Sequence, residues 1–215
     1  NRCIRTFKGH KASIINFNVS LSNRYLVSSS VDREIILWNF ITGKIIKRFK
    51  AHSGNIMALA FSADEKAFIS GGGFLDGRIM VWEIKTGQKK YFWKAHVGGI
   101  LSLKYSPDGK YILSTGGLGH STIKIWNAKN GTIISRAKFY GAVYNCKYSP
   151  LNKKIACASG FRSSRSINFW SKNLKNKLFY LSGHVKDVRS IDFSPDGKLL
   201  VSCSWNYNIV LWNIK

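Results

Sequence analysis

Five tryptophans recur at nearly constant spacing and divide the chain into five similar segments. They are Trp38, Trp82, Trp126, Trp170 and Trp212, and successive members lie 44, 44, 44 and 42 residues apart. Each closes a short, mainly apolar run of the same type, for example IILW before Asn39. A period of this size is typical of repeat proteins, in which one supersecondary unit stacks on its neighbours to bury a continuous core.

Each segment predicts four short β-strands. An apolar run such as IINFNVS leads into a turn rich in Ser, Asp, Asn or Gly, and a small-residue strand such as YLVSSS follows. The Trp run comes next, and a basic strand completes the unit. Strands of about 5 residues separated by turn chemistry indicate an all-β fold. The Trp runs lack polar alternation, which predicts sheets that are covered on both faces and stacked face to face.

A Gly-His or Ala-His pair stands upstream of four of the five tryptophans, and the fourth repeat has Phe139 at the His position. Together with the period of about 43 residues and the closing Trp, this pattern resembles the WD-repeat β-propeller family. One departure is that the residue after Trp is Asn, Glu, Asn, Ser and Asn, never Asp. The resemblance implies an all-β propeller with five four-stranded repeats, at about 1–42, 43–86, 87–130, 131–174 and 175–215.

The order of the predicted strands bears on ring closure. The chain begins with a predicted fourth strand, CIRTFKGH, and stops after a predicted third strand, IVLWNIK. In this family, first and last strands of that kind complete one blade, and seven blades are the norm. We therefore expect residues 1–215 to be a single propeller domain or a fragment of one, with two further repeats outside this sequence. The alternative is a self-closed ring of five blades with Arg5 paired beside Leu211.

The resemblance also implies a hydrogen-bonded chain of His, Ser or Thr, a turn Asp and Trp that braces each blade. In repeat three His120 stands in the Asp place, in repeat five Asn206 does, and repeat four, with Phe139, Cys157 and Ser164, should lack the network. The residues that match the pattern are His10, Ser28, Asp32 and Trp38; His52, Ser70, Asp76 and Trp82; His96, Ser114 and Trp126; and His184, Ser202, Asn206 and Trp212.

The same residue types invite a catalytic interpretation, since His beside Ser and Asp is the composition of a hydrolase triad. Here the set recurs once per repeat, which is expected of bracing and not of a single active site. The His residues belong to different repeats, so their spacing does not suggest a metal site. No carboxylate pair stands out for acid–base chemistry. The sequence predicts a non-catalytic protein without a metal, cofactor or small-molecule substrate.

The four cysteines, Cys3, Cys146, Cys157 and Cys203, form no C-x-x-C pair and no cluster with nearby His. We expect free, buried thiols in a reducing compartment and thus an intracellular location, cytoplasmic or nuclear. No run approaches the 18 apolar residues of a membrane span, so no membrane partner is expected.

The chain is strongly basic, with 34 Lys and Arg, 10 Asp and Glu, and a formal charge of +24. Half of the basic residues fall in the predicted fourth strands or the turns that lead into them. In a propeller these strands are the exposed outer edges, where Lys prevents edge-to-edge pairing. Three interpretations stay open: edge protection combined with compositional bias, a rim that binds a polyanion, and a surface for an acidic protein.

The loops beside the predicted His positions carry unusual aromatic and Arg residues, which are typical of interface hot spots. Some of them could instead fold back to fill gaps where the bracing residues are missing. The leading hypothesis is a protein-interaction scaffold that binds proteins or peptides in a multiprotein complex through this face. The alternative is an RNA- or DNA-associated propeller that uses its basic surface. The candidate partner-binding residues are Phe74, Leu75, Phe139, Tyr140, Phe161, Arg162, Arg165, Trp205 and Tyr207.

Overall fold

The computed structural model describes residues 2–50, 52–117, 121–139, 141–151, 153–160 and 165–214. These ranges contain nineteen β-strands, arranged as four four-stranded antiparallel sheets and one three-stranded sheet. No helix that could cross a bilayer occurs within them. The strands are β1 (Ile14–Val19), β2 (Tyr25–Ser30), β3 (Glu34–Asn39), β4 (Ile45–Lys50), β5 (Ile56–Phe61), β6 (Ala67–Gly72), β7 (Arg78–Glu83), β8 (Lys89–Lys94), β9 (Ile100–Tyr105), β10 (Tyr111–Gly116), β11 (Thr122–Asn127), β12 (Ile133–Lys138), β13 (Ala142–Tyr148), β14 (Lys154–Gly160), β15 (Ser166–Ser171), β16 (Lys177–Ser182), β17 (Val188–Phe193), β18 (Leu199–Ser204) and β19 (Ile209–Asn213).

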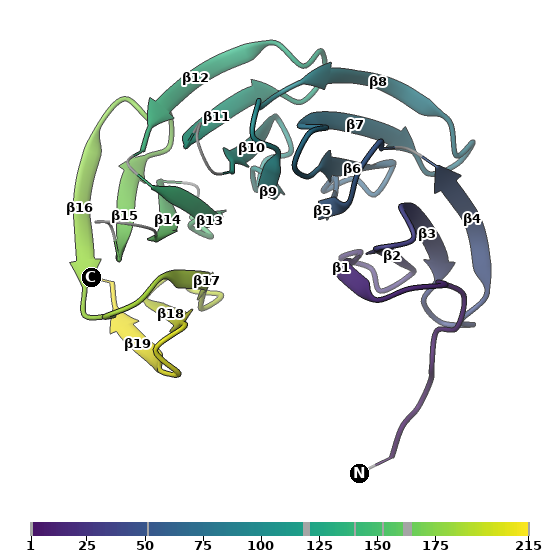
Figure 1. Ribbon diagram of the computed structural model, residues 1–215, viewed down its shortest axis with the longest axis horizontal. Helices are drawn as coiled ribbons and strands as arrows, with labels where there is room; N and C mark the ends of the chain where they lie inside the picture. Colours follow the sequence, from purple (N-terminus) through teal and green to yellow (C-terminus); the bar gives the residue numbers. More distant parts are fainter. Residues whose placement is uncertain are drawn as a thin grey trace.

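The sheets follow one another in chain order around a common axis and form an open arc (Figure 1). Within each sheet, strands that are consecutive in the chain are neighbours, with the first strand innermost. The fourth strands β4, β8, β12 and β16 lie on the outside of the arc. The predicted all-β propeller architecture is confirmed, while the number of blades in a complete ring stays a prediction.

Hairpin turns between the first and second strands explain why each repeat folds locally. In the turn from Ser106 to Tyr111, the Ser106 backbone N–H donates to the Tyr111 carbonyl at 2.8 Å, and the Ser106 hydroxyl accepts from the Tyr111 N–H at 3.0 Å. Gly109 sits in the left-handed region, at φ 69°, which a glycine adopts without steric cost. The Ser-Pro-Asp-Gly sequence therefore specifies this turn from local chemistry alone.

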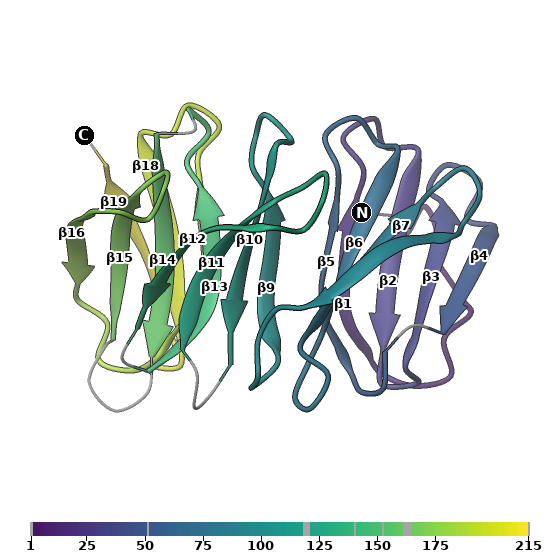
Figure 2. The same ribbon diagram turned by 90° about the horizontal axis from the view of Figure 1, so that it is seen from above.

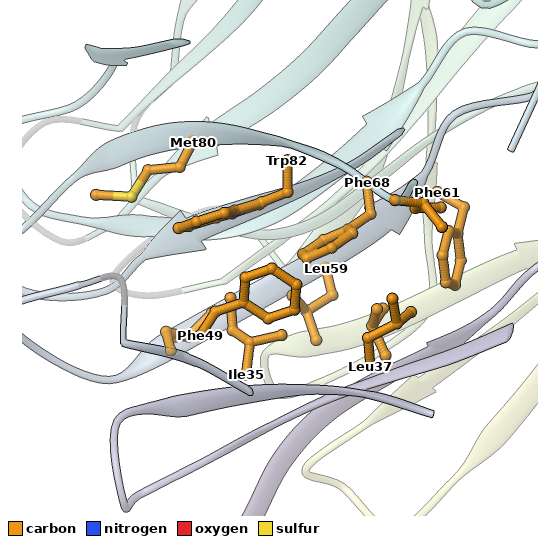
Figure 3. Packing of buried hydrophobic residues seen from close by; sticks show 11 residues of the cluster. Ile35, Leu37, Phe49, Leu59, Phe61, Phe68, Met80 and Trp82 are labelled. Atoms are coloured by element: carbon orange, nitrogen blue, oxygen red, sulfur yellow. The ribbon is translucent and has the colours of Figure 1, made fainter. Parts of the chain in front are cut away.

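Aromatic and aliphatic side chains fill the space between neighbouring sheets. Figure 3 shows the first such layer, in which Phe68 of β6 lies among Phe49, Phe61 and Trp82, with Leu37 of the first sheet close by. The Phe68 ring centroid is 5.3 Å from that of Phe49 and 6.1 Å from that of Trp82. Each sheet thus buries its apolar side chains against the next one, in agreement with the near-continuous apolar Trp strands.

The amino-terminal segment differs from its expected structure. CIRTFKGH is not a strand in the described chain, and β17–β19 form a three-stranded sheet. Instead, Phe7 packs against Trp38 and Phe40 at centroid distances of 5.6 and 5.9 Å, and Arg5 Nη1 donates to the Thr42 carbonyl at 2.8 Å. The self-closed ring of five blades is therefore not observed. A fourth strand needs the edge of β19 to pair with, and the segment lies beside the first sheet instead (Figure 1).

The expectation of four free thiols is wrong for two of them. Cys146 of β13 and Cys157 of β14 form a disulfide, whereas Cys3 and Cys203 are free. The expected burial is also wrong for Cys3, which is exposed on the irregular amino-terminal segment, and Cys203 is half-buried. The antiparallel register places Cys146 directly opposite Cys157, which brings the two sulfurs together. Motif spacing and compartment arguments do not consider strand register, so the sequence interpretation missed this pair.

The outermost strands carry basic side chains together with apolar ones. On β4 the residues Lys47, Arg48 and Lys50 are exposed, and on β8 Lys89 Nζ lies 4.7 Å from the centroid of the exposed Phe92 ring. Lys and Arg on an unpaired edge oppose pairing with another sheet. This arrangement supports edge protection as one role of the charge.

Replacing Phe68 by Ala should lower the free energy of unfolding by about 4 kcal/mol, because a fully buried ring is lost between two sheets. Phe92→Ala, on the exposed edge of the same sheet, should cost less than about 1 kcal/mol. Urea unfolding followed by tryptophan fluorescence measures both. Equal losses for the two variants would contradict the packing described here.

Candidate partner-binding surface

One side of the arc, which we call the loop face, is built from two sets of segments. These are the segments that lead into each inner strand and the turns that join second to third strands, at the bottom of Figure 2. Backbone hydrogen bonds tie the two sets together, so each turn has a fixed place beside its neighbouring segment. These bonds are Val31 N–H to Ser13 O, Gly73 N–H to Asn55 O, Gly117 N–H to Gly99 O, and Trp205 N–H to Asp187 O. The opposite side, which we call the turn face, carries the first-to-second and third-to-fourth strand turns.

In the first sheet, a serine hydroxyl links the Trp strand to the loop face. Ser28 Oγ accepts from Trp38 Nε1 at 2.8 Å and lies 2.8 Å from His10 Nε2. His10 Nδ1 in turn lies 2.9 Å from Asp32 Oδ2. Asp32 also accepts from the backbone N–H groups of Lys11 and Glu34 at 2.9 Å. A continuous series of side-chain contacts therefore connects the sheet interior to two loop segments.

Three further sheets repeat this arrangement around Ser70, Ser114 and Ser202. The His Nε2 to Ser Oγ distances are 2.8, 2.7 and 2.7 Å, and the Trp Nε1 to Ser Oγ distances are 2.9, 2.8 and 2.8 Å. The partners at His Nδ1 differ. They are Asp76 Oδ2 at 3.2 Å from His52, Thr122 Oγ1 at 3.1 Å from His96, and Asn206 Oδ1 at 3.3 Å from His184.

Thr122 was not predicted, because the sequence alignment of the repeats placed His120 there. His120 lies outside the described residues. Thr122 is the first residue of β11, and its hydroxyl reaches the imidazole from the strand instead of from the preceding turn. The sequence signal for this contact is the Thr122 hydroxyl, two residues after the aligned position, which the alignment did not consider.

In the fourth sheet, aromatic packing takes the place of the hydrogen-bonded set. The Phe139 ring lies 5.8 Å from the Trp170 ring, and the buried Trp170 Nε1 has no hydrogen-bond partner in the described part of the chain. Cys157, at the Ser position, is bound to Cys146. Ser164 lies outside the described residues.

Burial controls the charge of the imidazoles. Burial, with a smaller effect from Lys124, lowers the pKa of His96 to about 3. Burial also lowers the pKa of His52, although Asp76 opposes the shift. For Asp76, burial raises the pKa, but the Ser53 N–H and the nearby His52 outweigh it and leave the value below the usual range. Both imidazoles are neutral near pH 7. Among the described side chains, no group of three or more His, Cys, Asp or Glu could hold a metal ion.

The predicted partner-binding residues fall into three groups. Phe74, Leu75, Trp205 and Tyr207 have exposed fractions of 71%, 80%, 57% and 94%. Arg165 is also exposed and lines a hollow of about 410 Å³ that includes Lys177, Tyr180 and His184. Phe139 is half-buried against Trp170, which agrees with the alternative that some of these side chains fold back to fill gaps: its ring fills space beside a Trp that lacks the His and Ser partners. Tyr140, Phe161 and Arg162 lie outside the described residues.

The structure adds an arginine to this surface. The Arg189 guanidinium carbon lies 3.7 Å from the centroid of the Tyr144 ring and 4.3 Å from that of Trp205. The Tyr144 hydroxyl donates to Asp187 Oδ2 at 3.0 Å. We call Tyr144, Asp187, Arg189, Trp205 and Tyr207 the loop-face cluster. Arg189 is the one arginine in the five inner strands, which was a signal that the sequence interpretation overlooked.

The sequence matches the family described as "WD domain, G-beta repeat" over residues 1–39, 43–83, 87–127 and 175–213. The chain belongs to this family. The fourth repeat, in which Phe139 replaces His, lies between the last two matched stretches.

Relatives of this WD-repeat chain are distant and longer. WD repeat-containing protein SL1-17 of Schistosoma mansoni is 24% identical over the whole chain, and protein FIZZY-RELATED 1 of Arabidopsis thaliana is 26% identical over 98% of it. The chain spans 55% and 35% of their lengths. A chain in the crystal structure of a mitotic checkpoint complex matches with a TM-score of 0.89 and 23% identity, over 98% of this chain and 64% of that one. This match supports the fold alone.

Removing one buried serine hydroxyl should destabilise the WD-repeat chain more than removing an exposed one. Ser70→Ala leaves His52 Nε2 and Trp82 Nε1 buried without their partner, and we expect a loss of about 2 kcal/mol in the free energy of unfolding. The control, Ser182→Ala on the exposed β16, should change it by less than about 0.5 kcal/mol. Urea titration of both variants tests this, and a Ser70 loss no larger than that of Ser182 would count against bracing.

Mild acid should also destabilise the chain. The pKa of His96 is lower in the folded state than its ordinary value of 6.5, so protons bind preferentially to the unfolded chain below that pH. The stability that depends on neutral His96 is therefore present above pH 6.5 and is lost as pH falls toward 3. Between pH 7.5 and 5.5 this residue alone should cost about 1.4 kcal/mol.

The variant His96→Phe, which copies the residue of the fourth repeat, should have a smaller pH dependence than the parent chain over this interval. Denaturant midpoints at the two pH values give the slope for each protein. An unchanged slope in the variant would show that His96 is not the titrating group.

Proposed function

We propose that this WD-repeat chain is a non-catalytic scaffold that binds partner proteins or peptides through its loop face. The observation that carries the proposal is the position of Arg189 between the rings of Tyr144 and Trp205. The highly exposed Tyr207 lies two residues after Trp205 in the same turn. Stacking on two rings restricts the guanidinium, so little further conformational entropy is lost when it forms hydrogen bonds to a partner.

The chemistry of the loop-face cluster is suited to protein recognition. Trp, Tyr and Arg are the residue types enriched at interface hot spots. Arg189 makes no ion pair with another described residue, and its polar neighbour is the Tyr144 hydroxyl. Because a guanidinium has five N–H donors, Arg189 keeps donors for a carboxylate or carbonyl on a partner. Trp205 offers exposed aromatic surface beside it, so polar and apolar contacts can form at one place.

A second exposed patch lies on the turn between β6 and β7. Leu75 has a positive φ of 74°, which is unusual for a non-glycine residue. Asp76 fixes this turn, because its carboxylate accepts from the backbone N–H groups of Ser53 and Arg78. Phe74 and Leu75 are thus exposed on a turn that the Asp76 carboxylate holds in place. Strained backbone of this kind occurs preferentially at binding sites.

Other considerations support a scaffold role. The described His residues that resemble parts of a triad have both ring nitrogens close to neighbouring polar atoms within the bracing sets. Membership of a multiprotein complex and an intracellular location, cytoplasmic or nuclear, are part of the proposal. The disulfide between Cys146 and Cys157 removes the free-thiol argument for that location.

The test is affinity capture with immobilised chain, in which retained proteins are quantified by mass spectrometry. Arg189→Ala combined with Trp205→Ala should reduce retention of specific partners about tenfold or more, as expected when two hot-spot residues are truncated. Lys44→Gln combined with Lys175→Gln, at exposed positions on third-to-fourth strand turns, is the control and should leave retention unchanged. Circular dichroism must show that both variants are folded. Retention of every partner by the loop-face variant would overturn the proposal.

A further inference from the structure

A groove of about 720 Å³ lies on the turn face, between the second and third sheets, away from the loop-face cluster. Its walls are the first-to-second strand turns at 62–67 and 106–111 and the third-to-fourth strand turn at 127–129. This volume is in the range of sites that bind ligands or peptide side chains. None of the residues assigned to bracing or to the loop face lines it.

The groove lies where a side chain that links the preceding pair of sheets has no counterpart. Between the first and second sheets, Glu65 bridges the two turns by accepting from the Ser22 backbone N–H and hydroxyl, both at 2.5 Å. Lys47 Nζ adds a second bridge to the Thr86 carbonyl at 3.0 Å. In the third sheet, Gly109 occupies the turn position of Glu65. A Cβ atom placed on it would have only the Ala63 Cβ within 4 Å, at 3.7 Å.

Tyrosines form the inner wall of the groove. Tyr91, Tyr105 and Tyr111 line it and are half-buried, and the Tyr91 hydroxyl donates to the Ala128 carbonyl. The Tyr105 hydroxyl has no hydrogen-bond partner among the described residues. Burial, with smaller effects from Tyr91 and Asp64, raises its pKa, so it is a neutral donor near pH 7. The wall therefore combines apolar surface with an available phenol.

The rim of the groove is positively charged. Lys66, Lys90, Lys110 and Lys129 line it and are exposed. Among the described residues Lys90 forms an ion pair, with Glu83 at 3.4 Å, while Lys66 and Lys110 interact at longer range with Asp64 and Asp108. Two acidic residues, Asp64 and Asp108, also line the groove. Their Oδ1 atoms accept from groups of their own turns, the hydroxyls of Ser62 and Ser106 and the N–H groups of Lys66 and Lys110. The rim thus has an excess of positive charge.

We propose that this groove binds an acidic peptide segment of a partner protein, with an apolar or aromatic side chain of the segment against the tyrosines. Charge complementarity selects the class of ligand, since the rim lysines attract Asp and Glu side chains. An acceptor of the segment can pair with the Tyr105 hydroxyl. This site is separate from the loop face and does not depend on the proposed function.

The same features disfavour a nucleic acid. None of the described residues that line the groove is an arginine. The Tyr91 ring is stacked on Trp93 at a centroid distance of 5.9 Å, so one of its faces is covered. Asp64 and Asp108 would repel a continuous phosphate backbone. A peptide can place its acidic residues opposite the lysines and leave neutral residues opposite the aspartates.

The test is fluorescence anisotropy with a short fluorescein-labelled peptide that is rich in Asp and Glu around a central Tyr-Leu pair. Lys66→Gln combined with Lys129→Gln should weaken its binding about fivefold at low salt. Lys44→Gln combined with Lys175→Gln removes the same charge at exposed positions outside the groove and should change the affinity less than about twofold. Equal weakening in the two double variants would show binding to general surface charge and would overturn the proposal.

A neutral variant tests the groove without a change of charge. Gly109→Gln introduces a side chain at the mouth and should weaken binding about threefold or more. Its control is Gly197→Gln at the matching turn of the fifth sheet, where φ is also positive, at 72°. Thermal unfolding checks that both variants fold. No binding of the acidic peptide, or tighter binding of a labelled oligouridylate that Gly109→Gln weakens, would reject the peptide site.

Discussion

The serine hydroxyl shared by a tryptophan and a histidine is the interaction on which the loop face depends. Its oxygen lies at the centre of a sheet, accepts from the indole of the third strand, and lies within hydrogen-bonding distance of the imidazole of the segment before the inner strand. A buried polar group without a partner costs free energy, so a shared acceptor of this kind stabilises both donors. These hydrogen bonds in the sheet interior therefore fix the position of the loop segments. The exposed residues on those segments are held in a fixed geometry as a result.

The fourth sheet shows that the same architecture can be held together in another way. Phe139 against Trp170 replaces a polar network by aromatic contact, and the disulfide between Cys146 and Cys157 links the two innermost strands covalently. Packing and a covalent bond need no matched donors and acceptors. The repeat can therefore depart from the family pattern and still stack between its neighbours, because the interfaces between sheets are mainly apolar.

The sequence was sufficient to predict the architecture and the nineteen described strands, since the Trp period, the apolar runs and the turn residues are local signals. The strand predicted for CIRTFKGH was wrong, because a strand needs a partner edge and not only a strand-like composition. The His, Ser and Trp of four repeats follow from the same alignment. Other features depend on distances across strands that spacing does not report. The register of β13 and β14 pairs the cysteines. The position of Arg189 between two rings depends on how β13, β17 and the turn after β18 are placed relative to one another. The half-burial of Phe139 depends on the space beside Trp170, which no sequence pattern reveals.

Glu65 and Gly109 occupy the same turn position in adjacent repeats. Glu65 bridges the boundary between the first and second sheets, whereas Gly109 leaves the boundary between the second and third sheets without that bridge. The difference does not touch the apolar layers that hold the sheets together. A stacked repeat protein can therefore gain or lose a surface recess through one residue in a solvent-facing hairpin. Selection can act on each boundary separately, so a single chain has as many independent places for a new contact as it has neighbouring pairs of sheets.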